Sequence, residues 1–247
     1  MNAWTRALGR ATVSTPAASV ACQFAILAAV SILAGARLEL GAAYPVKVLV
    51  GFAVIGAVVI ALARGRLTAP SFGAANQITL GRAALTALLV GLFGEPAAPV
   101  LAWTALAVAI AVSILDGVDG AVARRRGQQS RFGARFDMEI DALLILVLAV
   151  LALQFGKAGA WVLAAGLLRY AFVAAGAVAP WLAAPLPARR RRQVVCVVQI
   201  VSLIVCLAPV IPTPWSAIAA ALGIGALTWS FAVDVVWLGH NRRRSTQ

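Results

Sequence analysis

The stretch DGVDGAVARRRGQQSRFGARFDMEID, residues 116–141, joins two apolar runs through a basic loop. Its four aspartates form two pairs, Asp116 with Asp119 and Asp137 with Asp141, and each pair lies where an apolar run meets the loop. A helix turns about 100° per residue, so steps of three or four residues return to one face. The spacing therefore predicts two helices that each present a pair of carboxylates beside the basic loop.

Carboxylates that lie close together repel one another. Two unit charges about 4 Å apart cost roughly 1 kcal/mol in water, and several-fold more beside a low-dielectric surface. Divalent cations relieve this repulsion. Ligand sets made only of oxygen are typical of magnesium, manganese or calcium rather than zinc.

The rest of the chain is strongly apolar: 62% of its 247 residues are hydrophobic and only 12% are charged. A soluble domain of this length has no room to bury so much apolar surface. Charge-poor segments recur along the chain, and each is long enough to cross a hydrocarbon layer of about 30 Å as a helix. We therefore predict an all-α, polytopic integral membrane protein with about eight transmembrane helices. The expected spans cover about residues 17–34, 46–63, 77–93, 98–115, 141–155, 159–180, 194–211 and 215–238.

The net charge of +13 is better explained by arginines that face anionic lipid, with a possible attraction of phosphorylated substrates, than by nucleic acid. We expect no nucleic-acid partner. Alternate loops differ sharply in Lys and Arg content, 16 against 3, which places both termini and the aspartates on the cytoplasmic side. The inside residues are Arg6, Arg10, Arg64, Arg66, Arg124, Arg125, Arg126, Arg131, Arg135, Arg189 to Arg192 and Arg242 to Arg244, and the outside residues are Arg37, Lys47 and Lys157.

Eight residues of the central stretch satisfy the pattern D-x2-D-G-x2-A-R-x8-G-x3-D-x3-D. They are Asp116, Asp119, Gly120, Ala123, Arg124, Gly133, Asp137 and Asp141. This pattern resembles the signature of the CDP-alcohol phosphatidyltransferases, membrane enzymes of phospholipid biosynthesis. The spans from about residue 77 onward equal the six of the family's core. We therefore divide the chain into a core, residues 71–247, and an N-terminal extension with two helices, residues 1–70.

The resemblance implies a metal-dependent transferase that moves a phosphatidyl group from a CDP-linked lipid, such as CDP-diacylglycerol, onto an alcohol and releases CMP. A phosphatidylglycerophosphate synthase-like activity with glycerol 3-phosphate as acceptor is our first expectation, and inositol phosphate or serine are the alternatives. The expected cofactors are two Mg²⁺ or Mn²⁺ ions. The resemblance also implies a homodimer, and we expect the plasma membrane of a bacterium as its location.

The resemblance further implies roles for the signature residues. Asp116, Asp119 and Asp137 are the expected metal ligands, and Asp141 is the expected general base and a further metal ligand. Nucleotide binding is expected at Gly120, Ala123, Arg124 and Gly133. Gly120 and Ala123 are small and let the nucleotide approach the backbone, and the Arg124 guanidinium can pair with phosphate oxygens. Gly133 is expected to let the loop re-enter its helix without a side-chain clash.

Upstream, Asn76, Thr79 and Arg82 resemble the N-x-x-T-x-x-R opening of the family's first core span. We expect Asn76 to cap that helix and all three to line the nucleotide pocket. Arginines within predicted spans are functional candidates by default, which applies to Arg82 and Arg169. Arg169 with Arg189, Arg190, Arg191 and Arg192 is the expected acceptor pocket, although the last four also fit topology-setting charge that faces lipid. Asp234 is expected to pair with an arginine of the C-terminal tail.

A function from another class, a cation transporter, is the main alternative. Transporters hold their ionisable residues near the bilayer midplane, between broken helices. In this chain the acids flank a basic loop at one surface, which favours an enzyme.

Overall fold

The computed structural model describes residues 15–63, 72–127, 130–187 and 189–244, except the side chains of residues 243 and 244. Arg6, Arg10, Arg64 and Arg66, which entered the orientation argument, lie outside these residues. Every regular element in the described ranges is helical, which confirms the all-α prediction. The α-helices are α2 (Pro16–Arg37), α3 (Tyr44–Ala63), α4 (Ala74–Gly91), α5 (Pro99–Arg125), α6 (Arg131–Gln154), α7 (Ala164–Val178), α8 (Arg190–Leu207) and α9 (Trp215–Arg244), with short 3₁₀ segments η1 (Ala160–Leu163) and η2 (Pro180–Ala183).

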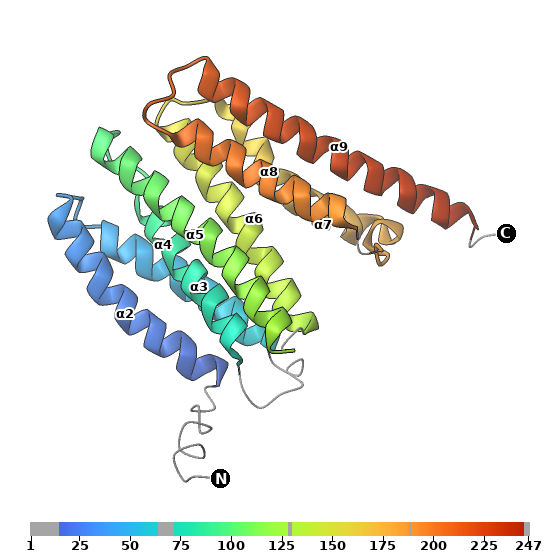
Figure 1. The fold of residues 1–247 in the computed structure, drawn as a ribbon, viewed down its shortest axis with the longest axis horizontal. Coiled ribbons are helices and arrows are strands. Elements are labelled where there is room, and N and C mark those ends of the chain that lie inside the picture. The colour runs from blue at the N-terminus through green and yellow to red at the C-terminus, as the bar shows by residue number, and fades with distance from the viewer. Residues whose placement is uncertain (1–14, 64–71, 128–129, 188, 245–247) are drawn as a thin grey trace, which may run out of the picture. The chain divides into compact units, whose positions relative to one another are not determined.

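The chain forms two compact units, and α5 and α6 contribute to both. The first unit takes residues 1–91 and 111–140, and the second takes residues 92–110 and 141–247. In the first unit α2, α3 and α4 lie side by side and pack against one another (Figure 1). Helix α2 begins with Thr15 as its N-cap, whose hydroxyl accepts the amide of Ala18 at 3.2 Å, followed by Pro16 in the first turn.

Close helix packing in the first unit depends on glycines and aromatic rings. A Cβ on Gly91 of α4 would lie 2.6 Å from Tyr44 Cε2 of α3, so only a glycine allows this approach. Phe72, Phe132 and Phe136 form a buried cluster with ring centroids 5.9–6.3 Å apart. This cluster joins the segment before α4 to the first turns of α6. It thereby sets the position of the next residue, Asp137, relative to α4.

In the second unit α8 and α9 pack along each other, and α7 contacts α9. Polar side chains tie the turns together. The Lys157 ammonium donates to the carbonyl oxygens of Ala208 at 3.0 Å and Ile211 at 2.8 Å, and the Gln154 amide donates to those of Leu92 and Glu95, each at 2.9 Å. These bonds hold the side chains against backbone carbonyl groups that follow the helix ends, and the Leu92 and Ala208 oxygens also accept a backbone amide.

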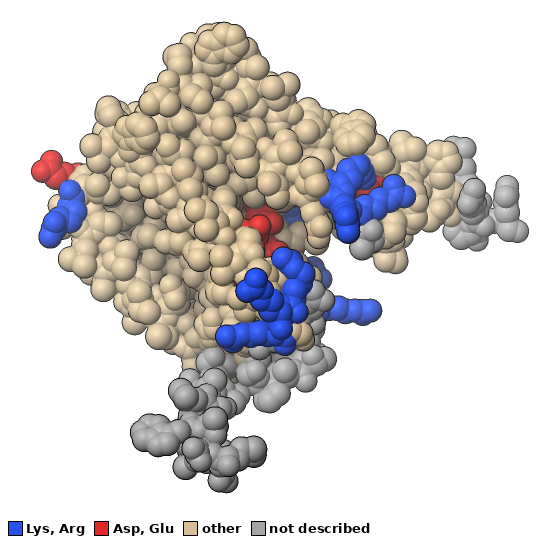
Figure 2. Space-filling view, viewed as in Figure 1, with Lys and Arg blue, Asp and Glu red and all other residues tan. Residues whose placement is uncertain are grey.

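The surface of the chain is that of a membrane protein. Uncharged residues cover most of the face seen in Figure 2, and the charged side chains gather in a few clusters. Five helices are long and apolar enough to cross a membrane, namely α2, α3, α5, α7 with η1, and α9. The other three, α4, α6 and α8, carry charged residues in their first half, including Arg82, Asp137 and Arg190.

Helices α5 and α6 extend further than the spans predicted at 98–115 and 141–155. The signature is therefore largely helical, and its aspartates lie within helices. Hydropathy marks the segment that lipid covers, whereas a helix continues until its backbone is capped. Here Gly127 ends α5 with a φ of +61°, a backbone conformation that suits glycine.

Candidate active site

Three helices of the first unit bring five predicted site residues together. Helix α4 supplies Thr79 and Arg82, α5 supplies Asp116 and Asp119, and α6 supplies Asp137. One ligand oxygen from each of the three aspartates lies within 4.8 Å of the others. The i, i+3 spacing explains the pairs within α4 and α5, since residues three apart share a helical face.

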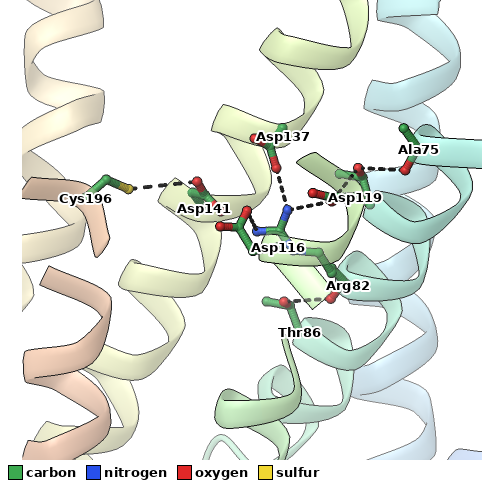
Figure 3. A network of polar contacts seen from close by, with 9 residues as sticks. Ala75, Arg82, Thr86, Asp116, Asp119, Asp137, Asp141 and Cys196 are labelled. Atoms are coloured by element: carbon green, nitrogen blue, oxygen red, sulfur yellow. Dashed lines mark hydrogen bonds and ion pairs between the residues drawn. The ribbon is translucent and has the colours of Figure 1, made fainter. Parts of the chain in front are cut away.

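The guanidinium of Arg82 lies among the three carboxylates (Figure 3). Its Nη2 is 2.8 Å from Asp116 Oδ1 and its Nη1 is 2.9 Å from Asp119 Oδ2, and Nη1 also contacts Asp137 Oδ1. The Arg82 side chain is fully buried, whereas those of Asp116 and Asp137 are 31% and 40% exposed. The cluster thus has a closed end at Arg82 and an accessible end at Asp116 and Asp137.

Asp119 is the most buried of the three carboxylates, with a side chain 6% exposed. Besides Arg82, its Oδ2 lies 2.9 Å from the Thr79 hydroxyl, which is also 3.1 Å from the Ala75 carbonyl oxygen. A hydroxyl has one proton to donate, so Thr79 serves one acceptor at a time. Thr79 and Arg82 together satisfy a carboxylate that would be costly to bury alone.

The structure differs from the expectation that Asn76 caps α4, and it places Gly133 in the first turn of α6. Asn76 is not a cap, because α4 begins two residues earlier and the Asn76 amide donates to the Phe72 carbonyl at 2.6 Å. Gly133 lies inside α6, where its amide donates to the Ser130 hydroxyl at 2.9 Å. A Cβ on Gly133 would be 2.9 Å from Asn76 Oδ1, so this glycine lets α4 and α6 approach. Ser130 is the α6 cap, and its place just before the helix was the signal that sequence reasoning missed.

Gly120, Ala123 and Arg124 lie in the last turns of α5. Arg124 is exposed, and its Nη1 would be 3.2 Å from a Cβ on Gly120, so the guanidinium lies over this glycine. A larger residue at position 120 would push the guanidinium away.

Asp141 belongs to the second unit. It lies one turn after Asp137 on the continuous helix α6, so the two share a face of that helix. In its own unit, an Asp141 oxygen lies 3.9 Å from the Cys196 thiol of α8. No sequence pattern indicates this contact, since the two residues are far apart in the chain.

The five arginines predicted to bind the acceptor also lie in the second unit, and their surroundings differ. Arg191 contacts Asp234 of α9 and donates to the Ser230 carbonyl at 2.7 Å, and Arg192 lies 3.9 Å from Asp234. We expected Asp234 to pair with an arginine of the C-terminal tail, but its described partners, Arg191 and Arg192, lie at the start of α8. Arg189 and Arg190 are exposed, and Arg169 is half-buried on α7.

The residues of the cluster fit a divalent cation. Asp116, Asp119 and Asp137 offer oxygen atoms only, which suits Mg²⁺ or Mn²⁺. Two of these carboxylates are accessible at the open end of the cluster. Asp116, Asp119 and Asp137 are therefore the residues that would hold the ion.

Fold and site define a class: an all-α polytopic membrane protein with an acidic cluster, suited to divalent cations, at the ends of its helices. Residues 72–233 match the CDP-alcohol phosphatidyltransferase family, and the chain belongs to that family. It is therefore an enzyme, a phosphotransferase that moves a phosphatidyl group from a CDP-alcohol. No curated protein and no solved structure matches the chain.

Proposed function

We propose that this enzyme transfers a phosphatidyl group from CDP-diacylglycerol to glycerol 3-phosphate, releases CMP, and depends on Mg²⁺ or Mn²⁺. The observation that carries the metal dependence is the convergence of Asp116, Asp119 and Asp137 within 4.8 Å. When bound, the cations supply charge neutralisation for the pyrophosphate and for the leaving nucleotide. The family match supports the donor class.

The chain's own residues are proposed to hold, orient and deprotonate the substrates. Asp141 accepts the proton of the acceptor hydroxyl as it attacks the β-phosphorus, and the bond from that phosphorus to the CMP oxygen breaks. Phosphoryl transfer depends mostly on such positioning and on charge. Asn76, Thr79, Arg82, Gly120, Ala123, Arg124 and Gly133 are proposed to shape the nucleotide site.

The acceptor is proposed to be an alcohol that carries a phosphate. Arg189 and Arg190 are exposed, so their charges remain available to an anionic group. Arg191 and Arg192 contribute to the same positive potential but are also bound to Asp234. Inositol phosphate satisfies this chemistry as well as glycerol 3-phosphate does, whereas serine lacks the phosphate.

The test is an acceptor panel. Purified protein in detergent is given CDP-diacylglycerol labelled in its lipid, with glycerol 3-phosphate, inositol phosphate or serine, and each lipid product is identified by mass. We expect CMP release and phosphatidylglycerophosphate only with glycerol 3-phosphate, with activity lost in EDTA and restored by Mg²⁺ or Mn²⁺. Product with another acceptor alone would overturn the acceptor assignment, and full activity in EDTA would overturn the metal dependence.

A further inference from the structure

We propose that Arg82 is a resident counter-ion of the aspartate cluster, which shares the neutralisation of the three carboxylates with the divalent cation and thereby sets how tightly that cation binds. This inference rests on the proposed function in one respect, that the cluster binds a divalent cation. It adds a positioning role for Arg82, which contacts the cluster directly and limits its net charge.

The first observation is the charge of the cluster. One guanidinium contacts three carboxylates, at 2.8 Å from Asp116 and 2.9 Å from Asp119. Their formal charges leave a net charge equal and opposite to that of one divalent cation. Arg82 thus matches the cluster to a single ion, and without it the cluster would carry one further negative charge.

The second observation is the geometry of the contacts. Arg82 contacts one named oxygen of each aspartate, namely Asp116 Oδ1, Asp119 Oδ2 and Asp137 Oδ1. A carboxylate has two oxygens and about four acceptor sites, so each retains capacity for a cation. Arg82 is fully buried at the closed end, whereas Asp116 and Asp137 are 31% and 40% exposed. The guanidinium therefore contacts the carboxylates from the closed end, and the cation can reach the same carboxylates from the open end.

Arg82 and the cation are coupled through the carboxylates that they share. Two positive groups that neutralise the same carboxylates repel each other. Each therefore weakens the attraction between the other group and the carboxylates. Such coupling is reciprocal: if Arg82 weakens cation binding, the cation weakens the stabilisation that Arg82 provides. Removal of the Arg82 charge should make the protein less stable in a chelator and more responsive to the cation.

The experiment measures thermal unfolding of the full chain in detergent, in EDTA and over a Mn²⁺ titration, for wild type, Arg82→Gln, Arg82→Lys and Thr86→Val. We expect Arg82→Gln to unfold at a lower temperature in EDTA and to bind Mn²⁺ about tenfold more tightly than wild type. Arg82→Lys keeps the charge and should retain the wild-type Mn²⁺ affinity. Thr86 is buried one turn along α4 and donates to the Arg82 carbonyl at 2.9 Å, so Thr86→Val should lower the unfolding temperature equally in both conditions.

A charge-balanced variant keeps the proposal testable if Arg82→Gln folds poorly. The double variant Arg82→Gln/Asp119→Asn removes one charge of each sign and neutralises the most buried carboxylate. It should unfold in EDTA at a higher temperature than Arg82→Gln alone. A double variant that is no more stable than Arg82→Gln would overturn the counter-ion role.

The other outcomes separate this inference from the proposed function. Equal Mn²⁺ shifts in wild type and Arg82→Gln would overturn the coupling and leave the metal dependence intact. No Mn²⁺ shift in either protein would overturn both. A shift in Arg82→Gln together with none in wild type would overturn the shared neutralisation, because the wild-type cluster would then bind no cation.

Discussion

At the scale of single residues, Asp119 and Arg82 form a pair of opposite charges in apolar surroundings, where either charge alone would be unfavourable. Both are buried, and the shared contact at 2.9 Å compensates each for lost hydration. Removal of one partner from such a pair costs roughly 3–5 kcal/mol, because the remaining charge is left buried without compensation. The same aspartate is a proposed metal ligand, so one carboxylate would serve both stability and the proposed catalysis.

The residue-scale prediction concerns Asp141. An Asp141→Asn enzyme keeps the size of the side chain but loses the carboxylate that is proposed to accept the hydroxyl proton. We expect kcat for CMP release to fall by about 10²–10⁴-fold. Glu139→Gln is the matched control, since Glu139 lies two residues from Asp141 on α6 and faces elsewhere, and it should retain activity. Normal turnover by Asp141→Asn would rule out this role.

At the scale of elements, several close contacts between helices are made at glycines. Gly166 of α7 lies against α6, where a Cβ at this position would be 2.6 Å from Leu146 Cα. Backbone does not move aside as a flexible side chain does, so this glycine fixes the distance between the two helices. At Gly91 in the first unit, α4 instead approaches the side chains of Val48 and Tyr44 on α3.

We predict that Gly166→Ala lowers the free energy of unfolding by about 1–3 kcal/mol, because the added methyl group overpacks the contact between α6 and α7. Thermal or denaturant unfolding in detergent measures the change. Gly225→Ala in α9 is the control, since no heavy atom lies within 4 Å of a Cβ there. It should leave stability equal or slightly higher, because alanine favours a helix. Equal losses from both changes would contradict the packing argument.

A second element-scale prediction separates the roles of neighbouring arginines in α8. Arg191 is bound to Asp234 and to the Ser230 carbonyl, whereas Arg190 is exposed. Arg191→Ala should therefore lower the unfolding temperature, since it leaves the buried Asp234 with weaker compensation. Arg190→Ala should leave unfolding unchanged and raise KM for the phosphorylated acceptor. An unchanged KM in Arg190→Ala would favour a lipid-facing role for that residue.

At the scale of the whole molecule, we propose that both termini and the catalytic aspartates face the cytoplasm of a bacterium, across its plasma membrane. The distribution of arginine between alternate loops supports this orientation. We also propose that residues 1–70 form an extension to the core, residues 71–247, since the family match begins at residue 72. The family resemblance further supports a homodimer, which the mass of the protein–detergent complex would test.

The orientation predicts which sites a membrane-impermeant thiol reagent reaches. In a background without Cys22, Cys196 and Cys206, a cysteine at Ala97 lies in an exposed turn predicted outside, and one at Arg126 lies in the exposed turn after α5. We expect Ala97→Cys to be labelled in intact cells, and Arg126→Cys only after permeabilisation. The opposite pattern would invert the topology.

Much of the fold was predictable because its signals are local. Eight apolar segments predicted eight helices, and the i, i+3 spacing of Asp116 with Asp119 predicted their shared face. The helix ends were predicted less well, because α5 and α6 continue past the apolar segments into the signature. The capping role of Ser130 was also readable in principle, whereas Asn76 was wrongly assigned as a cap.

The sequence by itself determined the helical membrane class, the four aspartates and the family, because hydropathy and short spacings act within one helix or one loop. Only the tertiary structure decided that the Arg82 guanidinium lies among Asp116, Asp119 and Asp137, and that Asp234 meets Arg191. These partners lie on different helices, and which charges meet depends on how the helices pack. That packing is set by contacts such as those of Phe72 with Phe132 and Phe136, which lie far from Phe72 in the chain.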